Sequence, residues 1–286
     1  MSAPDVTRRR LLGAGALGLS GLIAGCDRIN AAPGVRGLLE QVGDVHRVAQ
    51  RALIGRTALA KEFAPADMSP IFRANGSTHV ADPAYRAELG RGFAGWRLKV
   101  GGLVHRPLDL PLSALQALPQ RSQITRHDCV EGWSAIGKWQ GPRMGAVLAQ
   151  AGLMPAARYV VIHCADLYGG RPYYESIDLI DAFHEQTILA WQMNGGPLTE
   201  AHGAPLRLRV ERQLGYKQAK YVMGLELTDS LAGFFGGKGG YWEDVRGYQW
   251  YGGIWALASA QRALAGQHGL CHAQPRGDQS IIGFQP

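Results

Sequence analysis

The sequence predicts an α+β fold of mixed sheets with surrounding helices. Two observations favour this class: short runs of alternating apolar and polar residues are interspersed with a few segments of helical periodicity, and no regular strand–helix–strand order appears. Hydrophobic residues make up 46% of the 286 residues and charged residues 19%, as in a globular protein with a developed core.

Leu38, Leu39, Val42, Val45 and Val48 recur at helical spacing and predict one amphipathic helix over residues 35–63. Prolines and an Asn-Gly pair then break the pattern, as in extended loops. Alternation predicts strands, a short helix is expected behind Pro111, and Pro142 opens another helix. In chain order, the remaining elements are a strand at 96–100, a helix at 112–118, a strand at 124–129, a helix at 143–151, strands at 159–163, 187–193, 206–210 and 220–227, and a helix at 254–264.

The N-terminus has the features of an export signal. Arg8, Arg9 and Arg10 provide the paired arginines of a twin-arginine signal, followed by a weakly apolar stretch from Leu11 to Ala24. These 14 residues are fewer than the roughly 20 needed to span a bilayer. We therefore expect residues 1–25 to be a signal peptide that exports an already folded protein to the periplasm; a short anchor or a chance basic N-terminus is the alternative.

Residues 22–26 resemble a lipobox, in which Cys26 becomes a lipid-modified N-terminus. Asp27 directly after it resembles a signal that keeps lipoproteins at the inner membrane. Ordinary cleavage beyond the small residues, with Cys26 lost or incidental, is the alternative. The expected organisation is a twin-arginine, lipoprotein-like signal peptide (1–25), an N-terminal helical segment (26–65) and one oxidoreductase domain (66–286).

Charge and cysteine content exclude several classes. The formal charge of +7 falls to +5 without the signal peptide, and no long basic runs occur, so nucleic acid is not an expected partner. Four cysteines are too few for a disulfide framework. If Cys26 carries lipid and Cys129 carries chemistry, only Cys164 and Cys271 remain to pair in an oxidising periplasm.

Cys129 follows a strand-like run and begins the segment Cys-Val-Glu-Gly-Trp-Ser at 129–134. This segment resembles the molybdopterin domain of the sulfite oxidase superfamily, and among its members the periplasmic methionine-sulfoxide reductase catalytic subunits. The resemblance covers roughly residues 66–255. It rests on further motifs in the same order, at 193–198, 202–207, 215–220, 240–243 and 247–251.

The resemblance implies a Mo-molybdopterin cofactor with Cys129 as the metal ligand. A thiolate is a soft, strongly donating ligand that suits a thiophilic metal. For the pterin and its phosphate, it implies contacts from Asn75, Cys164, His202, Arg207, Gln218, Ala219 and Lys220. Cys164 replaces the small polar residue of relatives, so a disulfide with Cys271 is open, and Asn75 is also explained by an ordinary Asn-Gly turn.

Trp133 is expected in the active site, and Trp139 and nearby tyrosines could shape a cleft over the metal. Arg126 is the only obvious arginine near Cys129, and together with Asp128, Glu131 and Lys138 it gives a local charge of about zero. Sulfite is a dianion that needs converging cations. We therefore expect oxygen-atom transfer that reduces a small-molecule or protein-bound S- or N-oxide, with a haem-containing or quinol-linked electron partner; sulfite oxidation is the alternative.

Two interpretations from other functional classes, a zinc or thiol enzyme and a non-catalytic binding protein, remain open. The pairs His127/Cys129, His163/Cys164 and Cys271/His272 could bind zinc or form a thiol nucleophile, although their spacings match no common zinc pattern. A non-catalytic lipoprotein could instead use the fold as a binding module. Metal analysis of protein from a molybdenum-replete host separates the three.

Overall fold

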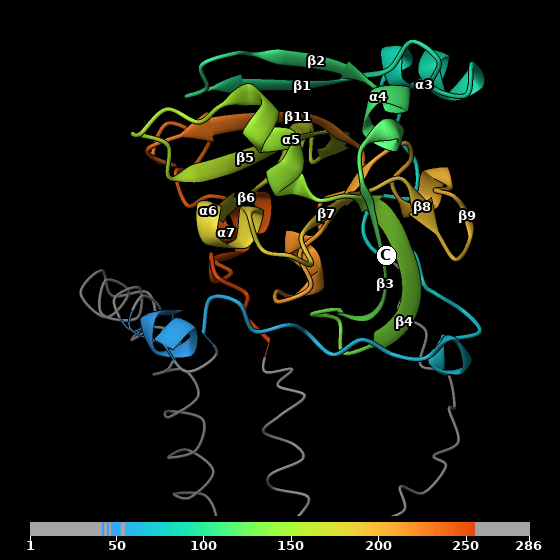
Figure 1. Ribbon diagram of the computed structural model, residues 1–286, viewed down its shortest axis with the longest axis horizontal. Coiled ribbons are helices and arrows are strands. Elements are labelled where there is room, and N and C mark those ends of the chain that lie inside the picture. The colour runs from blue at the N-terminus through green and yellow to red at the C-terminus, as the bar shows by residue number, and fades with distance from the viewer. Residues whose placement is uncertain (1–41, 43–44, 46, 53–54, 255–286) are drawn as a thin grey trace, which may run out of the picture.

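The computed structural model describes residues 42, 45, 47–52 and 55–254, whose strands form mixed sheets with helices around them (Figure 1). The strands are β1 (Arg97–Gly102), β2 (Leu108–Pro111), β3 (Gln120–Asp128), β4 (Ser134–Pro142), β5 (Tyr159–Tyr168), β6 (Arg171–Asp178), β7 (Ile188–Ala190), β8 (Gln192–Met193), β9 (Gly196–Pro197), β10 (Arg207–Arg209) and β11 (Val222–Thr228). The sheet orders are β2-β1-β11-β5-β6, β3-β4-β8-β9 and β10-β7. Since β1 and β11 are parallel while β5 runs antiparallel to both neighbours, the predicted mixed α+β class is confirmed.

Short helices connect these strands. They are α3 (Pro83–Gly90), α4 (Leu112–Ala117), α5 (Met144–Ala151), α6 (Leu179–Ala182) and α7 (Tyr241–Arg246), with single 3₁₀ turns at Pro65–Asp67, Glu200–His202 and Gly215–Lys217. Helix α3 begins behind Asp82, whose carboxylate accepts a hydrogen bond from the Tyr85 amide at 2.7 Å. Such capping satisfies one of the amides that a helix start leaves unpaired.

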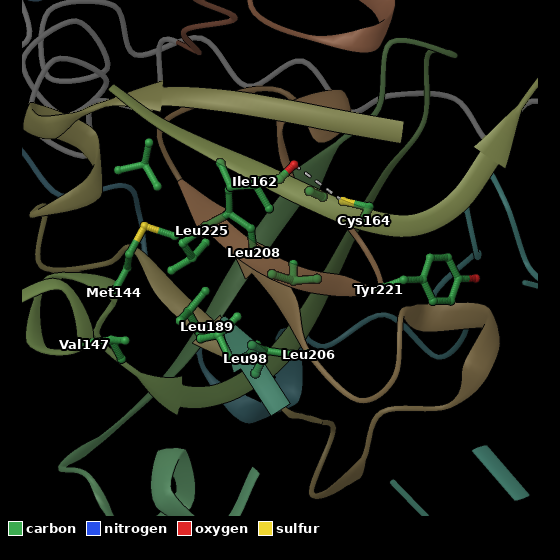
Figure 2. Close-up of a cluster of buried hydrophobic side chains, with 14 of the residues drawn as sticks. Leu98, Met144, Val147, Ile162, Cys164, Leu189, Leu206, Leu208, Tyr221 and Leu225 are labelled. Atoms are coloured by element: carbon green, nitrogen blue, oxygen red, sulfur yellow. Dashed lines mark hydrogen bonds between the residues drawn. The ribbon is translucent and has the colours of Figure 1, made fainter. Parts of the chain in front are cut away.

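The core lies between the five-stranded sheet, the β7–β10 pair and helix α5. Figure 2 shows buried side chains from all three meeting in one cluster. Its labelled members include Leu98, Met144, Val147, Ile162, Leu189, Leu208 and Leu225. These side chains are 2% exposed or less, so their burial fixes the sheets relative to one another.

Most of the expected strands and the two central helices are confirmed, with shifted ends. Helix α5 begins at Met144, and Pro142 ends β4 in place of opening the helix. The expected strand at 187–193 is split into β7 and β8. The helix expected at 254–264 lies, but for its first residue, outside the described residues.

The helix predicted over 35–63 is wrong in its second half. Residues 47–52 are helical, but the chain from Gly55 is extended. Arg212 donates to the carbonyls of Gly55 (3.0 Å) and Arg56 (2.7 Å), and Gln186 accepts from and donates to the Ala60 backbone at 2.7 and 3.0 Å. These side chains form hydrogen bonds with backbone groups that a helix would pair internally. Apolar periodicity in the sequence does not reveal such long-range bonds.

Strands β2, β4, β6 and β9 were not predicted. In β4 every second residue is buried, but two of these buried residues are glycines, so the sequence lacks the apolar alternation that predicts a strand. At Gly141, a Cβ would overlap the Leu189 carbonyl oxygen and lie 2.8 Å from the Ala190 Cα. The absent side chain therefore permits the close approach of β4 to β7.

Replacing Gly141 with alanine is expected to lower the free energy of unfolding by about 1–3 kcal/mol, because backbone would have to move to admit the methyl group. Urea unfolding measures the change. Gly101→Ala is the matched control, since nothing lies within 4 Å of its added Cβ. Equal stability of the two variants would contradict this packing argument.

Among the described residues, none of the helices has both the length and the apolar character that crossing a bilayer demands.

Candidate active site

Cys129 lies at the tip of the long β3–β4 hairpin. Its amide donates to the Trp133 carbonyl at 2.9 Å, and the Gly132 amide donates back to the Cys129 carbonyl at 3.1 Å. Gly132 has a φ of 87°, which a side chain would strain. Ser134 donates to the Asp128 carboxylate at 2.5 Å across the base of the turn. The thiol is thus held on a short, closed turn between two paired strands.

A pocket opens beside this turn and is bounded by five separate chain segments. Its lining combines the Cys129 turn, a loop before α3, the end of β5 with the start of β6, the segment before β11, and the region of α7. The lining residues are Asn75, Gly76, Ser77, Cys129, Val130, Glu131, Asp166, Tyr168, Tyr173, Gly215, Tyr216, Gln218, Ala219, Lys220, Trp242 and Tyr248. Burial raises the pKa of the Cys129 thiol, so ionisation in this pocket calls for a stabilising metal or cation.

Arg207 is a buried cation behind the pocket wall. Its side chain is 1% exposed, lies 4.8 Å over the Trp139 ring, and donates to the carbonyls of His202 (3.1 Å) and Gln218 (3.3 Å). Within the part of the chain that the structure describes, its Nε has no hydrogen-bond partner and no carboxylate forms an ion pair with it. Burial, followed by the charge of Arg209, lowers the pKa of Arg207 to about 9. A buried charge is costly without a counter-charge, so this environment favours an anion beside Arg207.

Lys220 adds a second cation. Its ammonium donates to the carbonyls of Asn75 (2.7 Å), Ala201 (2.9 Å) and Ser77, and so fastens the Asn75–Ser77 loop against the start of β11. Burial, followed by the charge of Arg207, lowers the pKa of Lys220 to about 7. Lys220 therefore contributes charge and loop position, since its three donors already have acceptors.

His127 lies under the Cys129 turn and is fully buried. Arg209 donates to its Nδ1 at 3.2 Å, and burial followed by the Arg209 charge lowers its pKa well below the usual value. The same Nδ1 lies 3.4 Å from Gln218 Oε1, while Nε2 has no hydrogen-bond partner among the described residues. Arg209 itself is neutralised by Glu211 at 2.6 Å, so the free cationic character belongs to Arg207 and Lys220.

Asp166 lines the pocket but was not predicted. Its Oδ2 accepts from Ser77 Oγ at 2.8 Å, its Oδ1 has no partner among the described residues, and burial raises its pKa. Val160, Ile162 and Cys164 precede it at every second position of β5, all buried. An acidic residue that continues an apolar, inward face was the signal that could have identified it.

Cys164, predicted to contact the cofactor, belongs to the hydrophobic core cluster and lies next to Ile162 (Figure 2). Its Sγ is 3.9 Å from the Ile162 carbonyl oxygen, and it is not part of the pocket lining. Asp166, two residues further along the same face of β5, is the residue that lines the pocket. Cys271 lies outside the described residues, so the disulfide with Cys164 stays a prediction.

The structure brings five predicted residues together in the pocket lining: Asn75, Cys129, Gln218, Ala219 and Lys220. Arg207 and His202 lie behind it, linked by the Arg207 bond to the His202 carbonyl. The His202 ring contacts the Phe72 carbonyl (3.2 Å) and Thr199 (2.8 Å). Trp133 also lies outside the lining and donates to Glu131 at 3.0 Å, so it supports the Cys129 turn from behind.

An aromatic wall faces the Cys129 turn. Neighbouring rings within it have centroids 5.1–6.0 Å apart, and its outer members Trp242 and Tyr248 stack. The wall comprises Tyr168, Tyr173, Tyr216, Tyr241, Trp242 and Tyr248. Trp139, which the sequence offered as one side chain that could shape the cleft, is fully buried under Arg207 and Arg209 and lies outside the pocket lining. An apolar strand position, rather than a cleft position, accounts for Trp139.

The described residues hold no group of three or more His, Cys, Asp and Glu side chains arranged to bind a metal. The His163 ring pairs with Glu226 at 2.8 Å while Cys164 is buried, so these neighbours point to different environments. Cys26, Cys271 and His272 lie outside the described residues. A single thiol beside buried cations and amides fits a metal held chiefly by an anionic organic group better than a protein-only zinc site.

Comparison with known proteins agrees with this donor set. Residues 87–233 match the family described as "Oxidoreductase molybdopterin binding domain". The "Putative protein-methionine-sulfoxide reductase subunit YedZ1" of Azospira oryzae is 46% identical over 160 residues, 56% of each chain. The "Uncharacterized oxidoreductase YuiH" of Bacillus subtilis is 31% identical over 60% of this chain and 82% of its own. The "Protein-methionine-sulfoxide reductase catalytic subunit MsrP" of Xanthomonas axonopodis pv. citri is 33% identical over 54% of this chain and 51% of its own.

Apart from YuiH, the matched region spans only about half the length of these curated relatives. Among solved structures, the sulfane dehydrogenase SoxCD from Paracoccus pantotrophus aligns with a TM-score of 0.44 and 23% identity, over 48% of this chain and 39% of its own.

Proposed function

The chain belongs to the oxidoreductase molybdopterin binding domain family, and from that premise we propose that it reduces an S- or N-oxide, with an S-oxide favoured. The cofactor of the family is Mo-molybdopterin, which supplies two-electron oxygen-atom transfer at the metal. The protein's part is to hold that group, admit a neutral oxide and exclude charged competitors.

The residues present fit this cofactor. Cys129 offers a thiolate at the pocket, and Arg207 is a buried cation that forms no ion pair within the described residues, which suits a phosphate. Asp166 Oδ1, which has no hydrogen-bond partner among the described residues, provides a carboxyl oxygen at the pocket for a heterocycle with several polar nitrogen atoms. Lys220 fixes the loop that carries Asn75 and Ser77 at the same pocket.

The charge of the pocket is the observation that favours reduction of an oxide over oxidation of sulfite. Its charged lining residues are Glu131, Asp166 and Lys220, with two carboxyl groups against one ammonium that is already bound to carbonyls. Arg126 pairs with Asp128 at 2.8 Å and lies outside the lining. This setting does not favour sulfite, whereas a neutral oxide between aromatic walls needs no converging cations.

More distant cations do not reverse this balance. Arg212 is bound to two carbonyls of the N-terminal segment, and Lys217 is buried between two carboxylates. Neither belongs to the pocket lining, nor does Arg171. The names of the YedZ1 and MsrP relatives support methionine sulfoxide, free or protein-bound, as the first substrate to test.

Steady-state kinetics with a reduced viologen and a panel of sulfoxides and N-oxides tests the proposal, set beside ferricyanide-coupled sulfite oxidation. We expect turnover with sulfoxides and none with sulfite. Sulfite oxidation without reductase activity would overturn the proposal and favour the alternative. Molybdenum and pterin analysis of the same preparation shows that the enzyme tested is loaded.

Cofactor retention is expected to depend on pH through Lys220. Without the cofactor the pKa of Lys220 is about 7, and an adjacent phosphate stabilises the ammonium and raises this pKa. Binding therefore takes up a proton above about pH 7 and none below it. The affinity should be constant below about pH 7 and fall by up to tenfold per pH unit between the free and the bound pKa. Pterin release measured from about pH 6 to pH 9 should lose this dependence in Lys220→Met and keep it in Lys99→Met, an exposed control. The same slope in Lys220→Met would show that another group titrates.

We further propose that the enzyme is exported by the twin-arginine route, tethered to the periplasmic face of the inner membrane by lipid on Cys26, and supplied with electrons by a haem-containing or quinol-linked membrane partner. The sequence of residues 7–27 supports this proposal. Fractionation of wild type against Cys26→Ser tests the tether. Equal release into the soluble periplasm would remove it.

A further inference from the structure

Three charged side chains are buried together behind the aromatic wall. Lys217 Nζ lies 2.5 Å from Glu175 Oε2 and 2.6 Å from Glu243 Oε1. Glu175 comes from β6, Lys217 from the turn before β11 and Glu243 from α7, and none of the side chains is more than 1% exposed. Two carboxyl groups therefore share one ammonium without solvent.

The cluster is one positive charge short of neutrality if every group is ionised. Around Gly240 the two carboxyl groups face the same small space, since a Cβ there would overlap Glu243 and lie 2.7 Å from Glu175 Oε2. Glu243 Oε2 has no hydrogen-bond partner among the described residues. A buried net charge is costly, so the cluster is stable when one carboxyl group holds a proton.

Tyr173 connects the cluster with the pocket. Its hydroxyl lies 3.3 Å from Glu175 Oε1 and 2.7 Å from the Tyr216 carbonyl, and the residue lines the pocket. The phenol has one proton, which the closer Tyr216 carbonyl accepts. A protonated Glu175 can then donate to the phenol oxygen, and rotation of the Tyr173 O–H towards the pocket completes a two-step path.

We propose that the Lys217–Glu175–Glu243 cluster stores one proton and delivers it through the Tyr173 hydroxyl to the oxygen that leaves the substrate. This inference rests on the proposed reductase function. Conversion of an S-oxide to a sulfide and water breaks the S–O bond and consumes two electrons and two protons. The electrons come from the haem- or quinol-linked donor, one proton comes from Glu175, and the second enters from solvent at the pocket mouth.

The electrostatics agree with this assignment. Burial, followed by the charge of Glu243, raises the pKa of Glu175 well above its usual value. Burial acts to lower the pKa of Lys217, but the two carboxylates outweigh it and raise that pKa, so Lys217 stays charged. The titratable groups that interact most strongly with Glu175 are Glu243, Lys217 and Tyr173. Its charge also acts on Cys164, Tyr174 and Tyr216. Since the stored proton is present only below the pKa of Glu175, the reduction rate should fall as pH rises through it.

The first readout is independent of turnover. Infrared difference spectra between high and low pH should contain the carbonyl stretch of one protonated carboxylic acid that shifts in D₂O. This band should be lost in Glu175→Gln. It should also be lost in Glu243→Gln, because Glu175 and Lys217 then form a neutral ion pair.

The second readout is the pH profile of sulfoxide reduction by the loaded enzyme. Tyr173→Phe should lower kcat about a hundredfold with little change in KM, a typical effect for loss of proton transfer, and remove its fall at high pH. Tyr174→Phe is the matched control, because its hydroxyl bonds to Asp244 at 2.5 Å and lies outside the pocket lining. Small weak acids added to Tyr173→Phe should restore part of the rate.

Failures of the two proposals are distinguishable. Wild-type reduction of sulfoxides with an unchanged kcat and pH profile in Tyr173→Phe would overturn the proton path and leave the proposed function intact. A wild-type enzyme without reductase activity would overturn both. If Glu175→Gln does not fold, the Glu243→Gln spectrum and the Tyr173→Phe profile still decide the inference.

Discussion

Cys129→Ser is expected to eliminate turnover while the protein retains its pterin. The turn that holds Cys129 is closed by backbone hydrogen bonds that do not involve the thiol, so the fold should be unaffected. The hydroxyl of serine is a harder and much less acidic ligand than a thiolate, and it does not provide the same electron donation to the metal. The thiolate-to-metal charge-transfer absorption should disappear together with activity.

Cys164→Ala is the control for this experiment. Cys164 is the other cysteine of the described residues, is buried and is not part of the pocket lining. It should keep both turnover and the charge-transfer band, with a small loss of stability from the missing sulfur atom. Full activity of Cys129→Ser, or loss of the band in Cys164→Ala, would place the metal ligand elsewhere.

Arg207→Met is expected to weaken cofactor binding by roughly ten- to a hundredfold, since a charge-assisted hydrogen bond to a phosphate contributes about 1.5–3 kcal/mol. The methionine side chain occupies much of the same buried space. In the cofactor-free protein the effect should be neutral or have the opposite sign, because the substitution removes a buried cation that has no ion-pair partner among the described residues.

Thermal unfolding of both forms measures these opposite effects. The loaded variant should unfold at a lower temperature than loaded wild type, whereas the cofactor-free variant should match or exceed cofactor-free wild type. Equal pterin content and unchanged stability of the loaded variant would show that Arg207 has only a structural role. Loss of stability in both forms would indicate that its bonds to the His202 and Gln218 carbonyls dominate.

The fold class and most central strands were predictable because their apolar periodicity lies in the sequence. Strand β4 was not, since glycine at positions 137 and 141 hides an inward face: the β7 backbone approaches Gly141, and the Phe72 ring packs over Gly137. The second half of the predicted N-terminal helix failed for another reason: its extended form depends on Arg212 and Gln186, which are more than 120 residues away in the chain.

In the pocket, too, residues in local motifs were predictable, whereas contacts between distant segments were not. Cys129 and the segment from Gln218 to Lys220 were identified from local motifs, and the structure brings them together. Asp166 was not predicted. The alternation of β5 has to be followed to the end of the strand before it shows that Asp166 lines the pocket. The Lys217–Glu175–Glu243 cluster joins three distant segments, and no local pattern predicts it.

Oxygen-atom transfer from an S-oxide to the reduced enzyme is the central claim, and a single-turnover experiment tests it most directly. Loaded protein is reduced stoichiometrically under anaerobic conditions and mixed rapidly with methionine sulfoxide, while the metal–thiolate absorption is followed. We expect complete return of the oxidised spectrum with one equivalent of sulfide formed, and no reduction when the oxidised enzyme is mixed with sulfite. Reduction of the oxidised enzyme by sulfite, with no reoxidation by any sulfoxide, would contradict the account.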